Sequence, residues 1–206
     1  VAIAAPLTKY SASITDGDRI NEFVDRAYKI ATNGYPGAVH LSLPVDLMFS
    51  SFPEDAGRQE RPFDLTSQAP SRAWPDPSRL ETVLKKLEAA SRPVLIGGHG
   101  VWWSCAEAYL EEAGRTLGIP VFNIPYHQKL LGEECEAYMG LADVHQYHPS
   151  ADAFNESDLV LMVGARLDNQ MNFGNAPLFP DTTELVCING SHEEIDFNRA
   201  ADFTLL

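Results

Sequence analysis

The sequence lacks several features that would each point to a particular class of protein. No apolar run approaches the roughly 20 residues needed to cross a bilayer, and no charged and then apolar stretch typical of a signal peptide opens the chain. The three cysteines are far apart, with no CxxC pair or metal-ligand spacing. The sequence therefore predicts reduced thiols and a cytoplasmic location, with Cys187 as a small buried apolar residue.

Positive charge is also scarce. Lysine and arginine number 15 against 29 acidic residues, which gives a net charge of −14. This excess argues against nucleic acid or an anionic membrane surface as a partner. A small anionic ligand stays open, because local arginines and backbone N–H groups can outweigh the overall field. The composition, 45% hydrophobic and 21% charged, is typical of an ordinary globular protein.

The first third of the chain predicts part of an α/β domain followed by a linker. Apolar side chains recur at helical spacing over residues 19–33, with Asp18 as the expected N-cap and Gly34 as the expected stop. Residues 38–43 alternate like a strand. We interpret residues 1–50 as the C-terminal part of an α/β domain in a piece of a longer polypeptide. Residues 51–76, rich in Pro, Ser and Arg, predict an extended linker.

From residue 77 onward the chain alternates between strand and helix patterns. Helices are expected around residues 80–87 and at 104–117, and residues 125–157 are less periodic. The alternation predicts parallel pairing with right-handed crossovers. Residues 77–206 are therefore expected to form a doubly wound α/β domain, whose ligands would lie beyond the carboxyl ends of its strands. The expected strands are 93–97, 119–124, 159–163, 185–189 and 203–206.

Glycines follow the first of these strands. Gly97, Gly98 and Gly100 surround His99 in a turn that resembles a dinucleotide-binding loop without the third glycine of a full GxGxxG. Glycines at this place let a backbone approach a ligand. They suit a tight strand-to-helix turn equally well. Spacing alone leaves the two interpretations open.

A stronger signal follows the strand at 159–163. Arg166, after Gly164 and Ala165, is a fixed cation where a phosphate could lie. We favour a phosphate or interface contact over a surface ion pair with Asp168. Asn189 follows the next strand, at a place where dinucleotide folds use an acid to bind ribose hydroxyls. An Asn-Gly turn explains Asn189 at least as well.

Two further pairs of side chains have simple alternative explanations. His145 and His148 have the look of a metal pair, but no Cys or carboxylate cluster completes it, so a metal site is disfavoured. Trp102 and Trp103 could stack on a base, and a contact between domains or subunits explains them better. Neither pair carries a functional prediction.

Taken together, five segments resemble the thiamine-diphosphate-dependent enzymes of the acetolactate synthase, benzaldehyde lyase and 2-hydroxyacyl-CoA lyase type. Residues 1–10 and 27–46 are similar to the end of the pyrimidine-binding domain of that family. Residues 91–100, 117–121 and 157–167 are similar to its central domain. The resemblance covers nearly the whole chain, and it is specific for the family rather than for one member.

The resemblance implies a six-stranded doubly wound central domain, which holds FAD in some members, ADP in others and nothing in the rest. Two departures stand against a nucleotide here. Tyr35 replaces an arginine of the nucleotide-binding members, and Asn189 replaces the acid at the strand end. By position, the residues that would line an ADP or FAD are Gly97, Gly98, Gly100, Gly164, Ala165, Arg166 and Asn189.

The same resemblance implies an enzyme that makes or cleaves a C–C bond next to a carbonyl of a 2-oxoacid, aldehyde or acyl-CoA. Thiamine diphosphate and Mg²⁺ would be held by segments outside this chain, so no catalytic residue is assigned here. A homodimer or homotetramer is implied as well. The alternative is a stand-alone nucleotide-binding or assembly module without catalysis.

Overall fold

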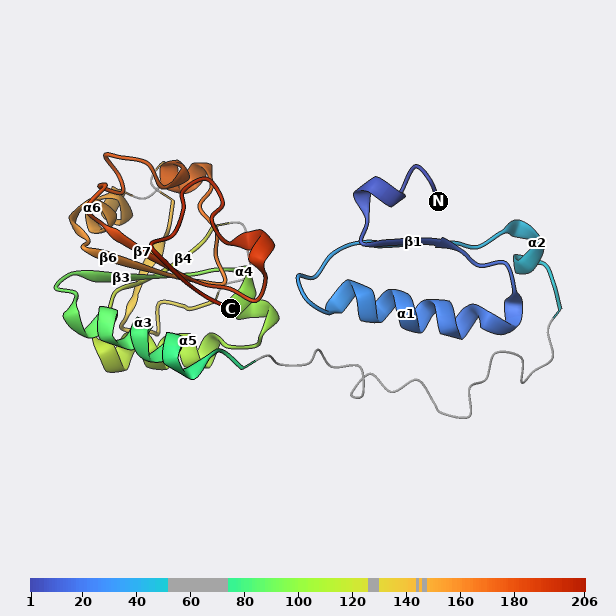
Figure 1. Ribbon diagram of the computed structural model, residues 1–206, viewed down its shortest axis with the longest axis horizontal. Helices are drawn as coiled ribbons and strands as arrows, with labels where there is room; N and C mark the ends of the chain where they lie inside the picture. The colour runs from blue at the N-terminus through green and yellow to red at the C-terminus, as the bar shows by residue number, and fades with distance from the viewer. Residues whose placement is uncertain (52–73, 126–129, 144, 146–147) are drawn as a thin grey trace. The chain divides into compact units, whose positions relative to one another are not determined.

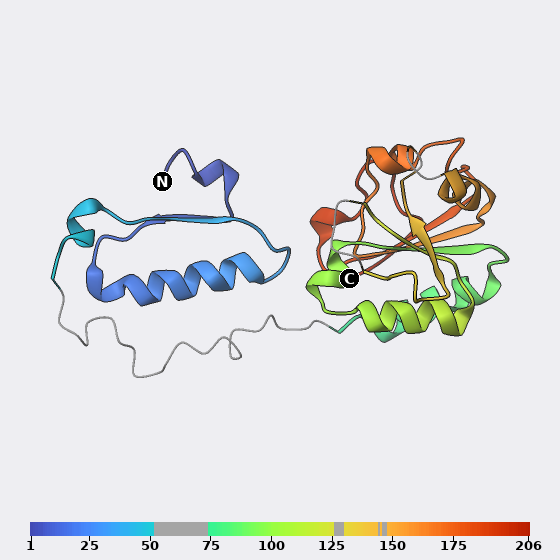
Figure 2. The same cartoon turned by 180° about the vertical axis from the view of Figure 1, so that it is seen from behind.

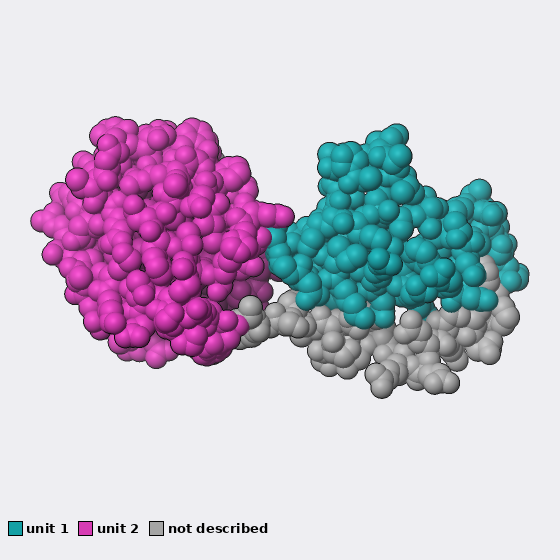
Figure 3. Space-filling view, in the orientation of Figure 1, with its two compact units in different colours: residues 1–73 teal, residues 74–206 magenta. Residues whose placement is uncertain are grey.

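The computed structural model describes residues 1–51, 74–125, 130–143, 145 and 148–206. The chain divides into two compact units, Val1–Ala73 and Trp74–Leu206, which are coloured separately in Figure 3. Most of the expected linker, residues 52–73, lies outside the described residues. Each unit is therefore considered by itself.

The first unit is a small parallel βαβ arrangement. Strands β1 (Tyr10–Ser13) and β2 (Val39–Ser42) pair in parallel, and α1 (Ile20–Thr32) connects them. Around them lie the 3-10 helices η1 (Ala5–Leu7) and η2 (Gly17–Arg19) and the short α2 (Val45–Met48). The strand–helix–strand order predicted for residues 1–50 is the one observed.

The ends of α1 differ from the expected capping residues. The cap belongs to η2, where the Asp16 side chain accepts a hydrogen bond from the backbone of Asp18 at 3.0 Å. Asp18 is therefore not the cap, because the chain enters α1 through a 3-10 turn. At the other end the last helical residue is Thr32 and Asn33 is the C-cap. The expected stop, Gly34, follows directly, with a φ of +66°. A glycine suits this left-handed position.

The second unit contains a six-stranded parallel sheet in the order β5-β4-β3-β6-β7-β8. Its pairings are all parallel, so the predicted doubly wound six-stranded fold is confirmed. The strands are β3 (Pro93–Gly97), β4 (Val121–Asn123), β5 (Tyr138–Leu141), β6 (Leu159–Val163), β7 (Glu184–Ile188) and β8 (Phe203–Leu205).

Helices cover both faces of this sheet (Figures 1 and 2). One face carries α3 (Pro77–Ala89), α4 (His99–Trp103) and α5 (Glu107–Leu117). The other carries α6 (His148–Glu156) and the 3-10 helix η4 (Asn169–Gly174). A last 3-10 helix, η5 (His192–Glu194), follows β7.

The apolar runs of the sequence build two cores, one on each face. Along β3, Ile96 points into the core beneath α6, whereas Leu95 points into the core beneath α3 and α5. In β6, Met162 and Leu161 divide in the same way. Successive strand residues face opposite sides, so a strand covered on both faces must be apolar throughout.

Three elements of the second unit differ from the sequence prediction. β5 and α6 lie in the stretch that showed no clear period. The helix expected at residues 104–117 starts three residues later, as α5 at Glu107, and a separate short helix, α4, precedes it; Cys105, with a φ of +49°, lies between the two. A left-handed non-glycine residue interrupts helical hydrogen bonding, and no pattern of residues predicted this break.

Candidate functional site

The chain order places a switch point between two central strands. From β3 the chain moves outward to β4 and β5, then returns to β6 on the other side of β3. In doubly wound sheets the crevice at such a point, beyond the carboxyl ends, is the usual ligand site. Gly98 and Gly164 follow these two strand ends, and Asn189 follows the end of neighbouring β7.

The two glycine turns at the switch point pack directly on each other. A Cβ on Gly98 would lie 2.4 Å from the Gly164 carbonyl oxygen, and one on Gly100 would lie 2.6 Å from the Gly164 Cα. The Gly98 N–H donates to Val163 O and the Gly100 N–H to Gly164 O, each at 2.9 Å. Backbone packing alone accounts for these glycines, and ligand contact by them stays a prediction.

Two other predicted site residues, Gly97 and Ala165, face the hydrophobic cores. A Cβ on Gly97 would lie 2.6 Å from the Leu110 side chain, so this glycine makes room for α5. Ala165 is 5% exposed and belongs to the core beneath α6. Both residues lie at the carboxyl edge of the sheet, but their side-chain positions face the cores rather than a ligand.

Arg166 is the predicted site residue whose side chain reaches outward. It is 48% exposed, and its guanidinium lies 3.6 Å from a carboxylate oxygen of Glu194. The guanidinium carbon also stands 5.3 Å from the centre of the Phe197 ring, a distance that permits a cation–π contact. The ion pair that the structure gives Arg166 is thus with Glu194, rather than with the Asp168 considered from the sequence.

Asn189 sits at the same edge, one strand further along. Its backbone N–H donates to Leu205 O at 3.0 Å, which continues the ladder between β7 and β8. The residue is half-buried, and a role toward ribose hydroxyls stays a prediction.

The segment after β7 holds the segment after β6 in place. The Asn198 side chain donates to Leu167 O at 2.7 Å. The Arg199 guanidinium donates to Thr183 O at 2.9 Å, to Gly174 O at 3.2 Å and to Phe179 O at 3.4 Å. These contacts join the loop after β7 to the loop after β6, and the sequence analysis identified neither residue.

The loop that Asn198 and Arg199 contact contains two residues with unfavourable backbone conformations. Asn172 and Phe173 both have left-handed conformations, with φ of +48° and +56°. Such a conformation is uncommon for a large residue and persists only when surrounding contacts enforce it. Its enforcement here comes from the Phe173 N–H, which donates to Asp168 O at 2.8 Å, and from Arg199.

Residues 80–206 match the model of a protein family described as "thiamine pyrophosphate enzyme, central domain". The chain belongs to the thiamine pyrophosphate enzymes. This match covers the second unit from within α3 to the last residue, and so includes the whole six-stranded sheet and the edge that carries Arg166.

Relatives of several activities belong to this thiamine pyrophosphate enzyme family. The chain is 27% identical over 207 residues to the acetolactate synthase large subunit of Cyanidium caldarium, covering 99% of this chain and 35% of the relative. It is 26% identical over 205 residues to a 2-hydroxyacyl-CoA lyase of Arabidopsis thaliana, covering 93% and 32%. The chain therefore spans about a third of the length of these relatives.

A solved structure has the same fold. The 4-hydroxybenzoylformate decarboxylase of Rhodococcus jostii RHA1, which depends on thiamine diphosphate, superposes with a TM-score of 0.73 at 20% identity. The superposition covers 98% of this chain and 37% of the decarboxylase. At this identity the likeness concerns the fold alone.

The described residues were also searched for metal-ligating side chains and for a reactive cysteine. Among them, no group of three His, Cys, Asp or Glu side chains is placed to hold a metal ion. His145 lies 2.9 Å from Asn169 O through its Nε2. Burial raises the pKa of Cys187 to about 12, with Asp196 and Asp202 contributing, so this thiol is inert near neutral pH, as its predicted buried position implies.

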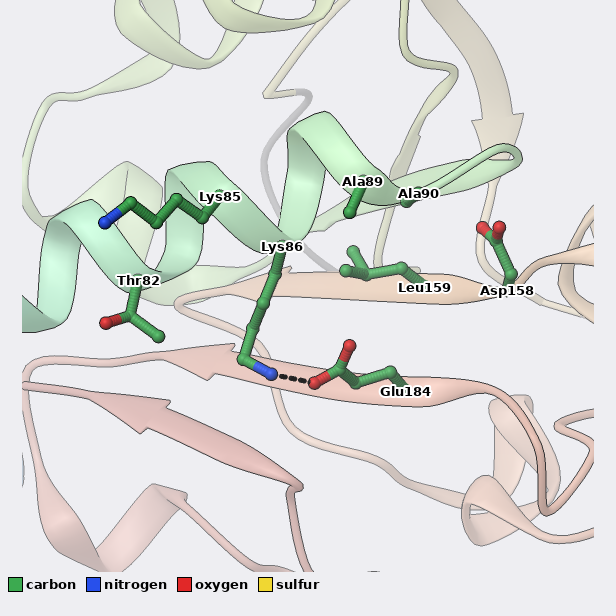
Figure 4. Close-up of a pocket in the computed structure, with 8 residues that line it drawn as sticks. All are labelled: Thr82, Lys85, Lys86, Ala89, Ala90, Asp158, Leu159 and Glu184. Atoms are coloured by element: carbon green, nitrogen blue, oxygen red, sulfur yellow. Dashed lines mark hydrogen bonds and ion pairs between the residues drawn. The ribbon is translucent and has the colours of Figure 1, made fainter.

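A hollow of about 370 Å³ lies at the opposite edge of the sheet (Figure 4). It is lined by α3 and by Leu159 and Glu184, the first residues of β6 and β7. Its two lysines are already paired, Lys86 with Glu184 and Lys85 with Glu81. Ligands of parallel sheets bind at the carboxyl edge, so this hollow is a packing feature between α3 and the strand starts.

A membrane-spanning helix is absent from the described residues, because none of their helices has the necessary length and apolar character.

Proposed function

We propose that the protein to which this chain belongs is a thiamine-diphosphate-dependent enzyme that makes or cleaves a C–C bond next to a carbonyl. The observation that carries this proposal is the match of residues 80–206 to the central domain of the thiamine pyrophosphate enzymes. Its relatives include synthases and lyases. The substrate would be a small 2-oxoacid, aldehyde or acyl-CoA, and the protein would act in the cytoplasm.

Residues 1–50 would complete the pyrimidine-binding domain of this enzyme, and residues 51–76 would link it to the central domain at 77–206. The support is how little the first unit buries. Of its described residues only Ile14, Gly17 and Ala27 are buried. Two strands and one helix rarely form a stable domain unaided, so further strands would cover this unit. A homodimer or homotetramer would bring the domains of two subunits together.

Thiamine diphosphate and Mg²⁺ would bind segments outside this chain. When bound, the cofactor supplies the carbanion chemistry, and the protein supplies orientation and electrostatics. The residues of this chain would then contribute a scaffold.

The central domain would be structural and would bind ADP or FAD at its carboxyl edge. Among the predicted site residues, Arg166 is the cation, half-exposed and able to take a phosphate oxygen. The predicted site comprises Gly97, Gly98, Gly100, Gly164, Ala165, Arg166 and Asn189. Because Tyr35 stands where nucleotide-binding members of the family have an arginine, we expect FAD to bind weakly or not at all.

A titration with ADP tests this site. A phosphate–guanidinium hydrogen bond contributes roughly 1.5–3 kcal/mol, so Arg166→Ala should weaken ADP binding by about tenfold or more. Isothermal calorimetry on the full-length protein measures this, and absorbance in the flavin band reports co-purified FAD. Equal ADP affinity in the two proteins would remove Arg166 from the site, and stoichiometric flavin would contradict the expectation drawn from Tyr35.

The alternative is a stand-alone nucleotide-binding or assembly module without catalysis. A test of full-length protein separates the two. Turnover of 2-oxoacids with added thiamine diphosphate and Mg²⁺ would support the enzyme, whereas nucleotide binding without thiamine diphosphate binding would support the module.

A further inference from the structure

Two asparagine–glycine pairs follow directly on regular elements of the chain, Asn33–Gly34 on α1 and Asn189–Gly190 on β7. In such a pair the backbone nitrogen of the glycine can attack the side-chain amide of the asparagine, because glycine has no side chain to hinder it. The reaction requires the attacking nitrogen and the amide carbon to reach a near-attack geometry. The surroundings of each pair in the fold therefore decide which pair reacts.

Hydrogen bonds hold the first pair in place. The side-chain amide of Asn33 donates to Lys29 O at 2.8 Å, so the nitrogen that would leave is fixed to the last turn of α1. The Lys9 ammonium donates to Asn33 O at 2.8 Å and to Tyr35 O at 2.7 Å. Gly34, at a φ of +66°, lies between these two fixed carbonyls. The two reacting groups of this pair therefore have little freedom to meet.

The second pair is free at both reacting groups. Within the described residues, no hydrogen bond is made by the Asn189 side chain or by the Gly190 N–H. Gly190 is exposed, and nothing lies within 4 Å of the position that a Cβ would take there. The backbone N–H of Asn189 is engaged, since it donates to Leu205 O at 3.0 Å. The sheet thus fixes the chain up to Asn189, while the amide and the glycine nitrogen can move toward each other.

We propose that Asn189 is a site of spontaneous deamidation. The Gly190 nitrogen loses its proton to water and forms a bond to Cγ of Asn189. The bond from Cγ to Nδ2 breaks, and the leaving nitrogen takes up a proton and departs as ammonia. Water then opens the five-membered imide at one of its two carbonyls. The product is an aspartate, or an isoaspartate in which the main chain runs through the former side-chain carbon. Water is the only co-reactant, and no bound ligand is needed.

The place of Asn189 in the fold gives the two products different effects. An aspartate adds one negative charge and leaves the length of the main chain unchanged. An isoaspartate adds one CH₂ group to the main chain between β7 and η5. The Ser191 side chain, which accepts the Glu193 N–H at 3.3 Å, caps η5 just beyond that point. Lengthening the chain there displaces η5 from the sheet, and with it the Glu194 carboxylate that lies 3.6 Å from Arg166.

The test ages the full-length protein in mildly alkaline buffer and follows both pairs by peptide mass spectrometry. In the native protein Asn189 should deamidate severalfold faster than Asn33. In urea, which removes the structural difference, the two pairs should react at comparable rates. Gly190→Ala should slow the reaction at Asn189 about tenfold or more, because the methyl group hinders the near-attack geometry. The fold tolerates that methyl group, since it meets nothing within 4 Å. Equal native rates at the two pairs, faster reaction at Asn33 or an unchanged rate in Gly190→Ala would overturn the proposal.

A second measurement follows the effect of the products on the fold. Anion exchange separates the aged protein by its added negative charge, and mass spectrometry identifies the isoaspartate fraction. Amide hydrogen exchange in residues 190–199 should be faster in that fraction than in the fresh protein. Asn189→Asp is the matched control, because it adds the same charge without lengthening the chain, and its exchange should equal that of the fresh protein. Unchanged exchange in the isoaspartate fraction, or equally fast exchange in Asn189→Asp, would overturn the effect assigned to chain lengthening.

Discussion

At the scale of single residues, Gly98 leaves no room for a side chain. Its Cβ would meet the Gly164 carbonyl at 2.4 Å and Ala165 at 2.6 Å, and all of these are atoms of fixed backbone or core. We expect Gly98→Ala to destabilise the protein by about 1–3 kcal/mol, as overpacking does. Gly190→Ala is the control, because nothing lies within 4 Å of the added methyl. Denaturant unfolding measures both, and equal midpoints would contradict the contact.

Asp158 ties the start of β3 to the start of β6. Its carboxylate accepts hydrogen bonds from the Ser91 N–H at 2.6 Å and the Arg92 N–H at 2.8 Å. Desolvation is the largest single influence and raises the pKa of Asp158. The backbone N–H groups of Ser91 and Arg92, with those of Asp158 and Leu159, outweigh it, so the pKa is lowered overall.

The sign of the pH effect follows from that lowered pKa. A carboxyl whose pKa is lower folded than unfolded stabilises the protein above its unfolded pKa, about 3.9. That contribution is lost as the pH falls through the folded pKa. Asp158→Asn should therefore reduce stability at pH 7 and flatten its dependence on pH below about 4. Urea midpoints between pH 2 and 7, about the range over which an aspartate titrates, measure this. Glu156→Gln is the control, because Glu156 makes only an exposed ion pair with Arg92.

The residues of the candidate site were predictable to different degrees. Arg166 was identifiable because a cation directly after a buried strand is poorly explained by packing. Glu194 was not, since its meeting with Arg166 depends on how two loops far apart in sequence fold toward each other. The glycines were found, but a residue without a side chain cannot reveal from sequence whether it makes room for a ligand or for another turn.

At the scale of elements, the buried central strands were predictable from the sequence, whereas the edge strand β5 was not. β3 and β6 were predicted at their observed bounds because both faces of each strand are covered and every position is apolar. β5 was missed because it is an edge strand that contains Gly140 at a φ of +113°. Edge strands have fewer neighbours to satisfy, so their sequences carry a weaker period.

We expect Arg199 to stabilise the conformation of the loop between β6 and β7. Its three hydrogen bonds reach Gly174, Phe179 and Thr183 across that loop. Arg199→Met should therefore speed amide hydrogen exchange in residues 169–183 by about tenfold or more, because hydrogen bonds to a charged group contribute about 1.5–3 kcal/mol. Arg115→Met, at an exposed position on α5, is the control. Equal exchange in both variants would show that the loop is held by its other contacts.

At the scale of the whole molecule, the order of elements indicated the architecture. Alternating strands and helices predicted a parallel sheet covered on both faces, and the six strands of the second unit form one. Hydrophobic pattern cannot reveal, however, which loops meet at the carboxyl edge. The resemblance to thiamine-diphosphate-dependent enzymes supplied the family, which the comparison of residues 80–206 confirms.

The 206-residue chain by itself should neither bind thiamine diphosphate tightly nor decarboxylate 2-oxoacids. It spans about a third of the length of its relatives, and its described residues offer no group of metal-ligating side chains for Mg²⁺. Calorimetry with thiamine diphosphate and Mg²⁺ should detect no binding at micromolar concentrations. The full-length protein is the positive control under the same conditions. Micromolar binding by the 206-residue chain would contradict the assignment of the cofactor to segments outside it, and would direct the search for its ligands to residues within this sequence.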